Sequence, residues 1–328
     1  MFKYTHFIPE NMAPVGAKSI GVYDSKGNKV YSIPLGSLAP IQKNKLYSFG
    51  ALSDPHIPED TAISDLENAL TIIGKSDCAF TCIAGDLTNG GTDAQLTTYQ
   101  EIIENHFKEY GKPVYAISGN HEATSGALDF DRMTPYTGYP LYYSFEKDSD
   151  VFIMVGHYKW TEHPFSPDEL EWLRNTLEKN KDKRCFVFTH MFPWGGSGNA
   201  LGKYKDNWWN TASGEGTEFE NLMKQYTNVI LFHGHSHFRF DLQELDKKAN
   251  YSSADGYRSI HIPSITIPRD IIDDSLSVMY AESEGYIVDV YDDCIVLNGI
   301  DFGKLNSDTG ERESMKLLPI ATYKIDTT

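Results

Sequence analysis

The sequence predicts an α/β fold. Short apolar runs that favour β-strands alternate with segments whose apolar residues recur at helical spacing, and turn residues separate the two kinds of segment. The chain has 328 residues, of which 40% are hydrophobic and 23% charged. It is therefore long enough for one large domain with a substantial buried core, or for such a domain with a small accessory piece.

The N-terminal 45 residues predict a small β element. Residues 19–23 and 29–33 are rich in β-formers, and residues 24–28 between them read Asp-Ser-Lys-Gly-Asn, which is typical of a turn. Pro34 and Pro40 then mark a connector.

Apolar runs predict the strands of the main domain. They cover residues 46–52, 78–84, 114–118, 151–155, 184–189 and 229–232. Residues 286–290 and 294–297 predict a further hairpin near the C-terminus, with its turn at Asp292 and Asp293.

The segments between these strands predict helices. Apolar stripes run through residues 63–73, 96–110 and 219–226. Another helix is expected to begin after Ser166, which is suited to be its N-cap, with Glu169 completing a capping box. We therefore divide the chain into a β element (1–45), a main α/β domain (46–270) and a C-terminal β segment (271–328) that packs on it.

The balance of charge argues against polyanionic partners. The 29 Lys and Arg residues are outnumbered by 46 Asp and Glu residues, which gives a net charge of −17. Since nucleic-acid binding relies on a basic surface, such a partner is not expected. The chain shows neither a secretory signal nor an apolar stretch of membrane-spanning length, so we expect a cytoplasmic protein that does not enter membranes.

The four cysteines predict buried thiols. Cys78, Cys82 and Cys185 lie in or beside apolar runs, and neither they nor Cys294 form a Cys-x-x-Cys pair. We therefore expect core residues rather than disulfides or zinc ligands.

Polar motifs follow five of the predicted strands. They are Asp54-Pro55-His56, Gly85-Asp86, Gly119-Asn120-His121-Glu122, Thr189-His190 and Gly234-His235-Ser236-His237. Each motif alone has an ordinary explanation as a turn or a hydrogen-bonded histidine. Together they place imidazoles and carboxylates where α/β proteins bind ligands, and this mixture suits manganese, iron or zinc.

This set of motifs resembles that of the calcineurin-like metallophosphoesterase family. The resemblance covers residues 54–237 and implies a four-layer αββα sandwich with two mixed β-sheets. No arginine follows Gly85-Asp86 closely. The resemblance is therefore nearer to the cyclic-nucleotide phosphodiesterase and purple acid phosphatase branches than to the protein phosphatases.

The family's site residues carry over motif by motif. The resemblance implies a first metal ion bound by Asp54, His56 and His237, and a bridging carboxylate from Asp86. The second ion would be bound by Asn120, His190 and His235. The expected cofactors are two divalent or trivalent transition-metal ions, with manganese or iron favoured and zinc also suited.

The implied reaction is hydrolysis of a phosphate ester by a metal-bridging hydroxide. His121 is expected to be catalytic, either beside the phosphoryl group or as the proton donor to the leaving group. The expected substrate is a small organic phosphate, attacked by a phosphodiesterase or a phosphatase. Candidate substrate-binding residues are Asn120, His121, His157, His163 and Arg269.

Several alternatives stay open. His157 and His163 also fit an ordinary polar loop, and Arg269 fits a surface salt bridge. A nuclease and a catalytically silent binding scaffold are the competing functions, the first disfavoured by the net charge and the second by the complete ligand set. Oligomeric state does not follow from the sequence.

Overall fold

A computed structural model describes most of the chain. The described residues are 19–23, 29–34, 45–59, 61–160, 164–193, 196–199, 215–253, 256–272, 275–279, 282–306 and 308–327. Among them, none of the helices combines the length and hydrophobicity that crossing a bilayer requires.

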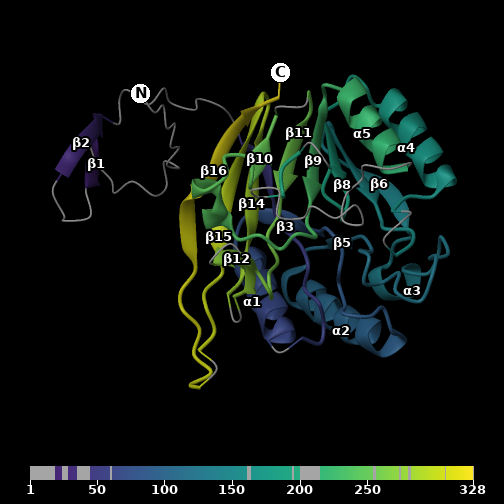
Figure 1. Cartoon of the computed structure of the whole chain (residues 1–328), viewed down its shortest axis with the longest axis horizontal. Helices are drawn as coiled ribbons and strands as arrows, with labels where there is room; N and C mark the ends of the chain where they lie inside the picture. The colour runs from purple at the N-terminus through teal and green to yellow at the C-terminus, as the bar shows by residue number, and fades with distance from the viewer. Residues whose placement is uncertain are drawn as a thin grey trace.

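Two six-stranded sheets form the body of the protein (Figure 1). The first sheet has the order β16 (Lys316–Asp326), β15 (Cys294–Asp301), β14 (Glu284–Tyr291), β3 (Lys45–Leu52), β4 (Cys78–Ile83) and β5 (Val114–Ala116). The second sheet has the order β10 (Tyr251–Ser252), β11 (Arg258–His261), β9 (Val229–His233), β8 (Cys185–Phe188), β7 (Asp150–Val155) and β6 (Tyr142–Lys147).

Both sheets are mixed, as expected. In the first sheet β3, β4 and β5 run parallel, while β14, β15 and β16 pair antiparallel. In the second sheet β7, β8, β9 and β11 run parallel, with antiparallel β6 and β10 at the edges. Two separate two-stranded sheets pair β1 (Ser19–Tyr23) with β2 (Lys29–Pro34) and β12 (Arg269–Ile272) with β13 (Ser275–Val278), both antiparallel.

The core is divided by the two sheets. Aromatic residues fill the space between them: the rings of Phe49 on β3 and Phe152 on β7 meet edge to face, with centroids 5.2 Å apart. Helices α1 (Ala62–Lys75) and α2 (Asp93–Tyr110) cover the outer face of the first sheet. The outer face of the second sheet is covered by α4 (Pro167–Lys179) and α5 (Glu215–Gln225), which lie beside it in Figure 1.

Burial on both faces explains the apolar strands. On β4, Cys82 faces the space between the sheets and Ile83 faces the helices, so neither can be polar without cost. Ser166 caps α4 and Glu169 completes the capping box, as the sequence predicts. The four cysteines are free and buried, also as predicted.

The C-terminal segment is part of the first sheet. Strand β14 pairs antiparallel with β3 and with β15, so residues beyond 270 supply half of this sheet's strands. The domain limits drawn from the sequence stay a prediction. The sequence did not predict β6, β10, β11, β12, β13 or β16, which are edge strands, short strands or strands of a separate two-stranded sheet.

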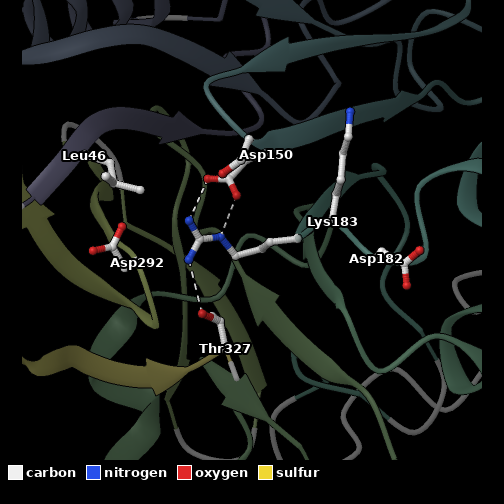
Figure 2. Close-up of a pocket in the computed structure, with 8 residues that line it drawn as sticks. Leu46, Asp150, Asp182, Lys183, Asp292 and Thr327 are labelled. Atoms are coloured by element: carbon white, nitrogen blue, oxygen red, sulfur yellow. Dashed lines mark hydrogen bonds and ion pairs between the residues drawn. The ribbon is translucent and has the colours of Figure 1, made fainter.

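A buried ion pair holds the sheets together at the edge where β7 and β8 begin (Figure 2). Arg184 donates from Nε and Nη2 to the two carboxylate oxygens of Asp150, at 3.0 and 2.6 Å. Its Nη1 donates to the carbonyl oxygen of Tyr291 at 2.8 Å and to the hydroxyl of Thr327 at 3.1 Å. The Tyr47 hydroxyl donates to the same carboxylate at 2.5 Å. The two-point pairing joins the start of β7 to the residue before β8. The bonds to Tyr47, Tyr291 and Thr327 connect this pair to β3, to β14 and to the residue after β16.

Candidate metal centre

The predicted ligands lie at the opposite edge, where the parallel strands end. The β3 and β4 loops carry Asp54, His56 and Asp86, and the β5 loop carries Asn120. From the second sheet, the β8 loop carries His190 and the β9 loop carries His235 and His237. Because the sheets pack face to face, these loops meet across the interface between them.

A first group of donor atoms belongs to Asp54, His56, Asp86 and His237, all buried. Nε2 of His237 lies 2.9 Å from Oδ1 of Asp54 and 3.1 Å from Nε2 of His56. Oδ1 of Asp54 has no hydrogen-bond partner within the described part of the chain, although His237 is so close. Donor atoms that lie this close together are suited to sharing a cation.

A second group shares Asp86 with the first. It consists of Asp86, His190 and His235, again all buried. Nε2 of His190 lies 3.1 Å from Oδ2 of Asp86, 3.0 Å from Nδ1 of His235 and 3.0 Å from Oδ1 of Asn120. The structure thus brings together every residue expected to bind metal.

The surroundings of His190 favour a positive charge at this place. Its Nδ1 lies 2.8 Å from the carbonyl oxygen of Ala84, which can only accept, so Nδ1 carries a hydrogen. In the neutral ring, Nε2 would then point a lone pair at the Asp86 carboxylate. Burial opposes ionisation of the ring, but Asp86 and Asp54 outweigh it and raise the pKa of His190 to about 9. A proton or a metal ion must supply the charge.

The pKa values of Asp54, His235 and His237 are shifted in the opposite direction, downward. Burial alone would raise the pKa of Asp54, yet the imidazoles of His237 and His190 hold it well below its usual range. Burial lowers the pKa of His237 to about 3 and that of His235 well below its usual range. The site therefore offers an ionised Asp54 beside the neutral imidazoles of His235 and His237, which are the protonation states that bind metal, whereas His190 would exchange its proton for the ion.

The backbone of the site is strained. Asp54, His56, Asp86, His235 and His237 have φ values of 56°, 52°, 48°, 75° and 60°. This left-handed region is uncommon for residues with a side chain. Among the described residues, Asp148 in the β6–β7 turn is the other non-glycine residue there. Strain that gathers in this way is typical of functional sites.

Two motif glycines allow the loops to touch. A Cβ on Gly119 would lie 2.1 Å from Oδ1 of Asp86, and one on Gly234 would lie 2.4 Å from Oδ2 of Asp54 and 1.9 Å from Oγ of Ser53. No side chain fits at such distances. These glycines therefore set how closely the loops approach.

His121 borders the centre. Its backbone N–H donates to Oδ1 of Asp86 at 2.9 Å, and its Nδ1 donates to the carbonyl oxygen of Asn89 at 2.9 Å. This leaves Nε2 on the side of the donor groups, 3.9 Å from Oδ2 of Asp86. The side chain is 26% exposed, so Nε2 can meet a molecule from solvent.

Comparison with known proteins decides the family. The profile of the calcineurin-like phosphoesterases matches residues 47–239, more than half of the chain. The chain belongs to the calcineurin-like phosphoesterase family. The matched region contains every motif named above and ends before β14, β15 and β16. A comparison with curated proteins finds no match.

Solved structures share the phosphoesterase fold at low sequence identity. A dimetal phosphatase from Danio rerio is 12% identical, with a TM-score of 0.60 over 87% of this chain and 100% of its own. The Plasmodium protein GAP50 is 14% identical, with a TM-score of 0.54 over 84% and 89%. A purple acid phosphatase from yellow lupin is 13% identical, with a TM-score of 0.50 over 83% and 53%.

Glu122 is a residue of the candidate centre to which the sequence motifs alone assigned no role. Its Oε1 accepts from the backbone N–H and the hydroxyl of Thr88, both at 2.8 Å. Its Oε2 accepts from the backbone N–H of Gly119 at 2.7 Å. Glu122 therefore ties the β4 loop to the β5 loop, on which Asp86 and Asn120 sit. Its place in the Gly-Asn-His-Glu motif was the available signal.

The other candidate residues lie at different depths. His157 is buried behind His190, with ring centroids 6.4 Å apart, which does not bring it to the surface of the site. The backbone of Arg269 donates to the carbonyl oxygen of His237 at 2.7 Å, and its charge helps to lower the pKa of His237 beyond the effect of burial. His163 lies outside the described residues.

Proposed function

We propose that the protein hydrolyses phosphate esters of small organic molecules with the help of two transition-metal ions. The observation that carries this proposal is the pair of buried donor groups that share Asp86. A single structural ion would not need two groups, and two ions around one carboxylate are typical of enzymes that transfer phosphoryl groups.

The donor chemistry fits such ions. Asp54, His56 and His237 would hold one ion and Asn120, His190 and His235 the other, with Asp86 between them. Imidazole nitrogens and carboxylate oxygens favour manganese, iron or zinc over calcium. When bound, the two ions would activate water and neutralise charge on the phosphate.

We propose that His121 protonates the leaving group. The carbonyl of Asn89 fixes the hydrogen on Nδ1, so Nε2 is the atom that can hold a second proton. That atom faces the donor groups. A protonated Nε2 could donate to the oxygen that departs from phosphorus, which is general acid catalysis.

The substrate class follows from charge and from the motifs. A net charge of −17 disfavours a nucleic acid, so we favour a small phosphate ester, and a phosphodiester before a monoester because the arginine of the protein-phosphatase motif is missing. Arg269 is a candidate contact to the phosphate. His157, being buried, is proposed to support His190 rather than to touch substrate. The cytoplasmic location stays a prediction.

Turnover of generic esters tests the proposal. Purified protein loaded with manganese should hydrolyse bis-p-nitrophenyl phosphate faster than p-nitrophenyl phosphate, and chelation should stop both reactions. Elemental analysis of the same sample should find two metal ions per chain. Metal-loaded protein that hydrolyses neither ester would count against an enzyme of this class.

A binding scaffold is the alternative. GAP50, which shares the fold, is described as the anchor in the inner membrane complex of Plasmodium. The complete donor set of this chain favours catalysis instead, since a scaffold has no need of two overlapping metal groups.

A further inference from the structure

Trp160 is a large aromatic side chain left open to solvent at the edge of the candidate centre. It lies in the loop after β7, and its exposed fraction is 36%. Its indole lies against the ring of His121, with centroids 5.6 Å apart and planes inclined by 72°. Neither the metal centre nor the core accounts for this exposure.

His121 contacts both Trp160 and the donor groups. Besides the indole, its ring meets the ring of His56, with centroids 4.6 Å apart, and its Nε2 lies 3.9 Å from Oδ2 of Asp86. A phosphate ester bound at the donor groups with its leaving group toward His121 would bring that group to the indole of Trp160.

The backbone two residues before Trp160 is held by two hydrogen bonds. The N–H of Leu128 donates to the carbonyl oxygen of Tyr158 at 2.8 Å, and the N–H of Tyr158 donates to the carbonyl oxygen of Pro164 at 2.8 Å. These bonds fix the chain just before the indole, which reduces the order that must be gained when a ligand packs on it.

We propose that Trp160 forms the leaving-group subsite and favours phosphate esters whose leaving group carries a flat aromatic ring, such as a benzyl, aryl or nucleoside ester. This inference rests on the proposed function and names its substrate class. An indole offers a broad apolar face, on which flat rings stack largely irrespective of their substituents. A saturated ring of similar size cannot stack in this way.

Two matched esters test the inference. Benzyl phosphate and cyclohexylmethyl phosphate differ in the flatness of the ring, while both leave as primary alcohols. The manganese-loaded protein should show kcat/KM about tenfold higher for benzyl phosphate, within the range of base-on-aromatic stacking. Trp160→Ala should abolish this preference, lowering kcat/KM for the benzyl ester about tenfold and for the saturated ester less than twofold. Trp160→Phe should retain most of it.

A binding measurement supplies a readout without turnover. Benzylphosphonate, which cannot be hydrolysed at its carbon–phosphorus bond, should bind the metal-loaded protein about tenfold more weakly after Trp160→Ala in calorimetry. Phe107→Ala is the matched control, because Phe107 is 55% exposed on α2 and lies outside the site. It should change neither the ester preference nor the affinity.

The outcomes separate the two proposals. Equal losses for both esters in Trp160→Ala, or an unchanged preference, would overturn the subsite while leaving the phosphoesterase intact. Metal-loaded wild-type protein that hydrolyses no ester and binds no phosphonate would remove the proposed function, and the subsite with it.

Discussion

Nε2 of His190 lies 3.1 Å from Oδ2 of Asp86, where the two groups of donor atoms overlap. The two residues follow strands of different sheets, β8 and β4. Their distance therefore depends on how the sheets pack. The charge of Asp86 is shared with His56, whose Nε2 lies 3.5 Å from the same oxygen.

Asp86→Asn should release at least one metal ion per chain. The amide keeps the shape of the carboxylate but removes the charge and one of the two oxygens that a bridge requires. Even supporting residues of metal sites change affinity 10–100-fold, so we expect activity to fall by at least about 100-fold. Elemental analysis after gel filtration measures the metal. Asp148→Asn is the control, because it also has a left-handed backbone but lies outside the site. Retention of both ions in Asp86→Asn would contradict the bridge.

His121→Asn should slow turnover and leave the metal content unchanged. General acid catalysis contributes about 10²–10⁴-fold, and the backbone bond from residue 121 to Asp86 does not depend on the side chain. Steady-state rates and elemental analysis on one sample give both quantities. A variant as active as the wild type would show that Nε2 donates no proton in the reaction.

Asp150→Asn should destabilise the fold by about 3–5 kcal/mol, because it leaves the buried guanidinium of Arg184 with an uncompensated charge. Urea unfolding followed by circular dichroism measures the change. The neighbouring Lys183 pairs with Glu146 at 2.9 Å in solvent, so Lys183→Ala is a matched control that should cost less than about 1 kcal/mol. Similar losses for both variants would mean that burial adds nothing to the Arg184 pair.

Glu284→Gln should flatten the dependence of stability on pH. Burial raises the pKa of Glu284 to about 8, although the backbone N–H of Phe240, which donates to it at 2.8 Å, opposes the shift. Between the ordinary pKa of glutamate near 4.5 and about 8, the folded state keeps a proton that the unfolded state has lost. Stability therefore falls as pH rises through this window, by up to about 1.4 kcal/mol per pH unit.

The glutamine variant has no such proton to lose. Its stability relative to the wild type should increase from pH 5 to pH 8 in denaturant titrations. A difference between the two proteins that does not change with pH would mean that Glu284 is ionised in the folded state throughout.

Local patterns were sufficient for much of the fold. Strand β4 is apolar on both faces because both are covered, and Ser166 with Glu169 marks the start of α4 through bonds made within one turn. Such features depend on neighbours in the chain. The edge strand β6, which is half-exposed, carries no comparable signal.

The sequence did not predict which residues several side chains contact. Glu122 binds Thr88 across two loops, and Arg184 binds the carbonyl oxygen of Tyr291 at the end of β14, 107 residues away. Trp160 meets His121 from a different loop. No periodicity encodes such contacts, because they arise where separate elements pack.

The sequence by itself determined the alternation of strands and helices and the chemistry of the motifs at the strand ends. Both depend only on the types of residue and on their spacing along the chain. Only the tertiary structure decided that donors from two sheets converge on Asp86, that β14 extends the first sheet beside β3, and that an exposed indole stands next to His121. Those outcomes depend on how two twisted sheets stack around an aromatic core, which is a property of the packed molecule as a whole.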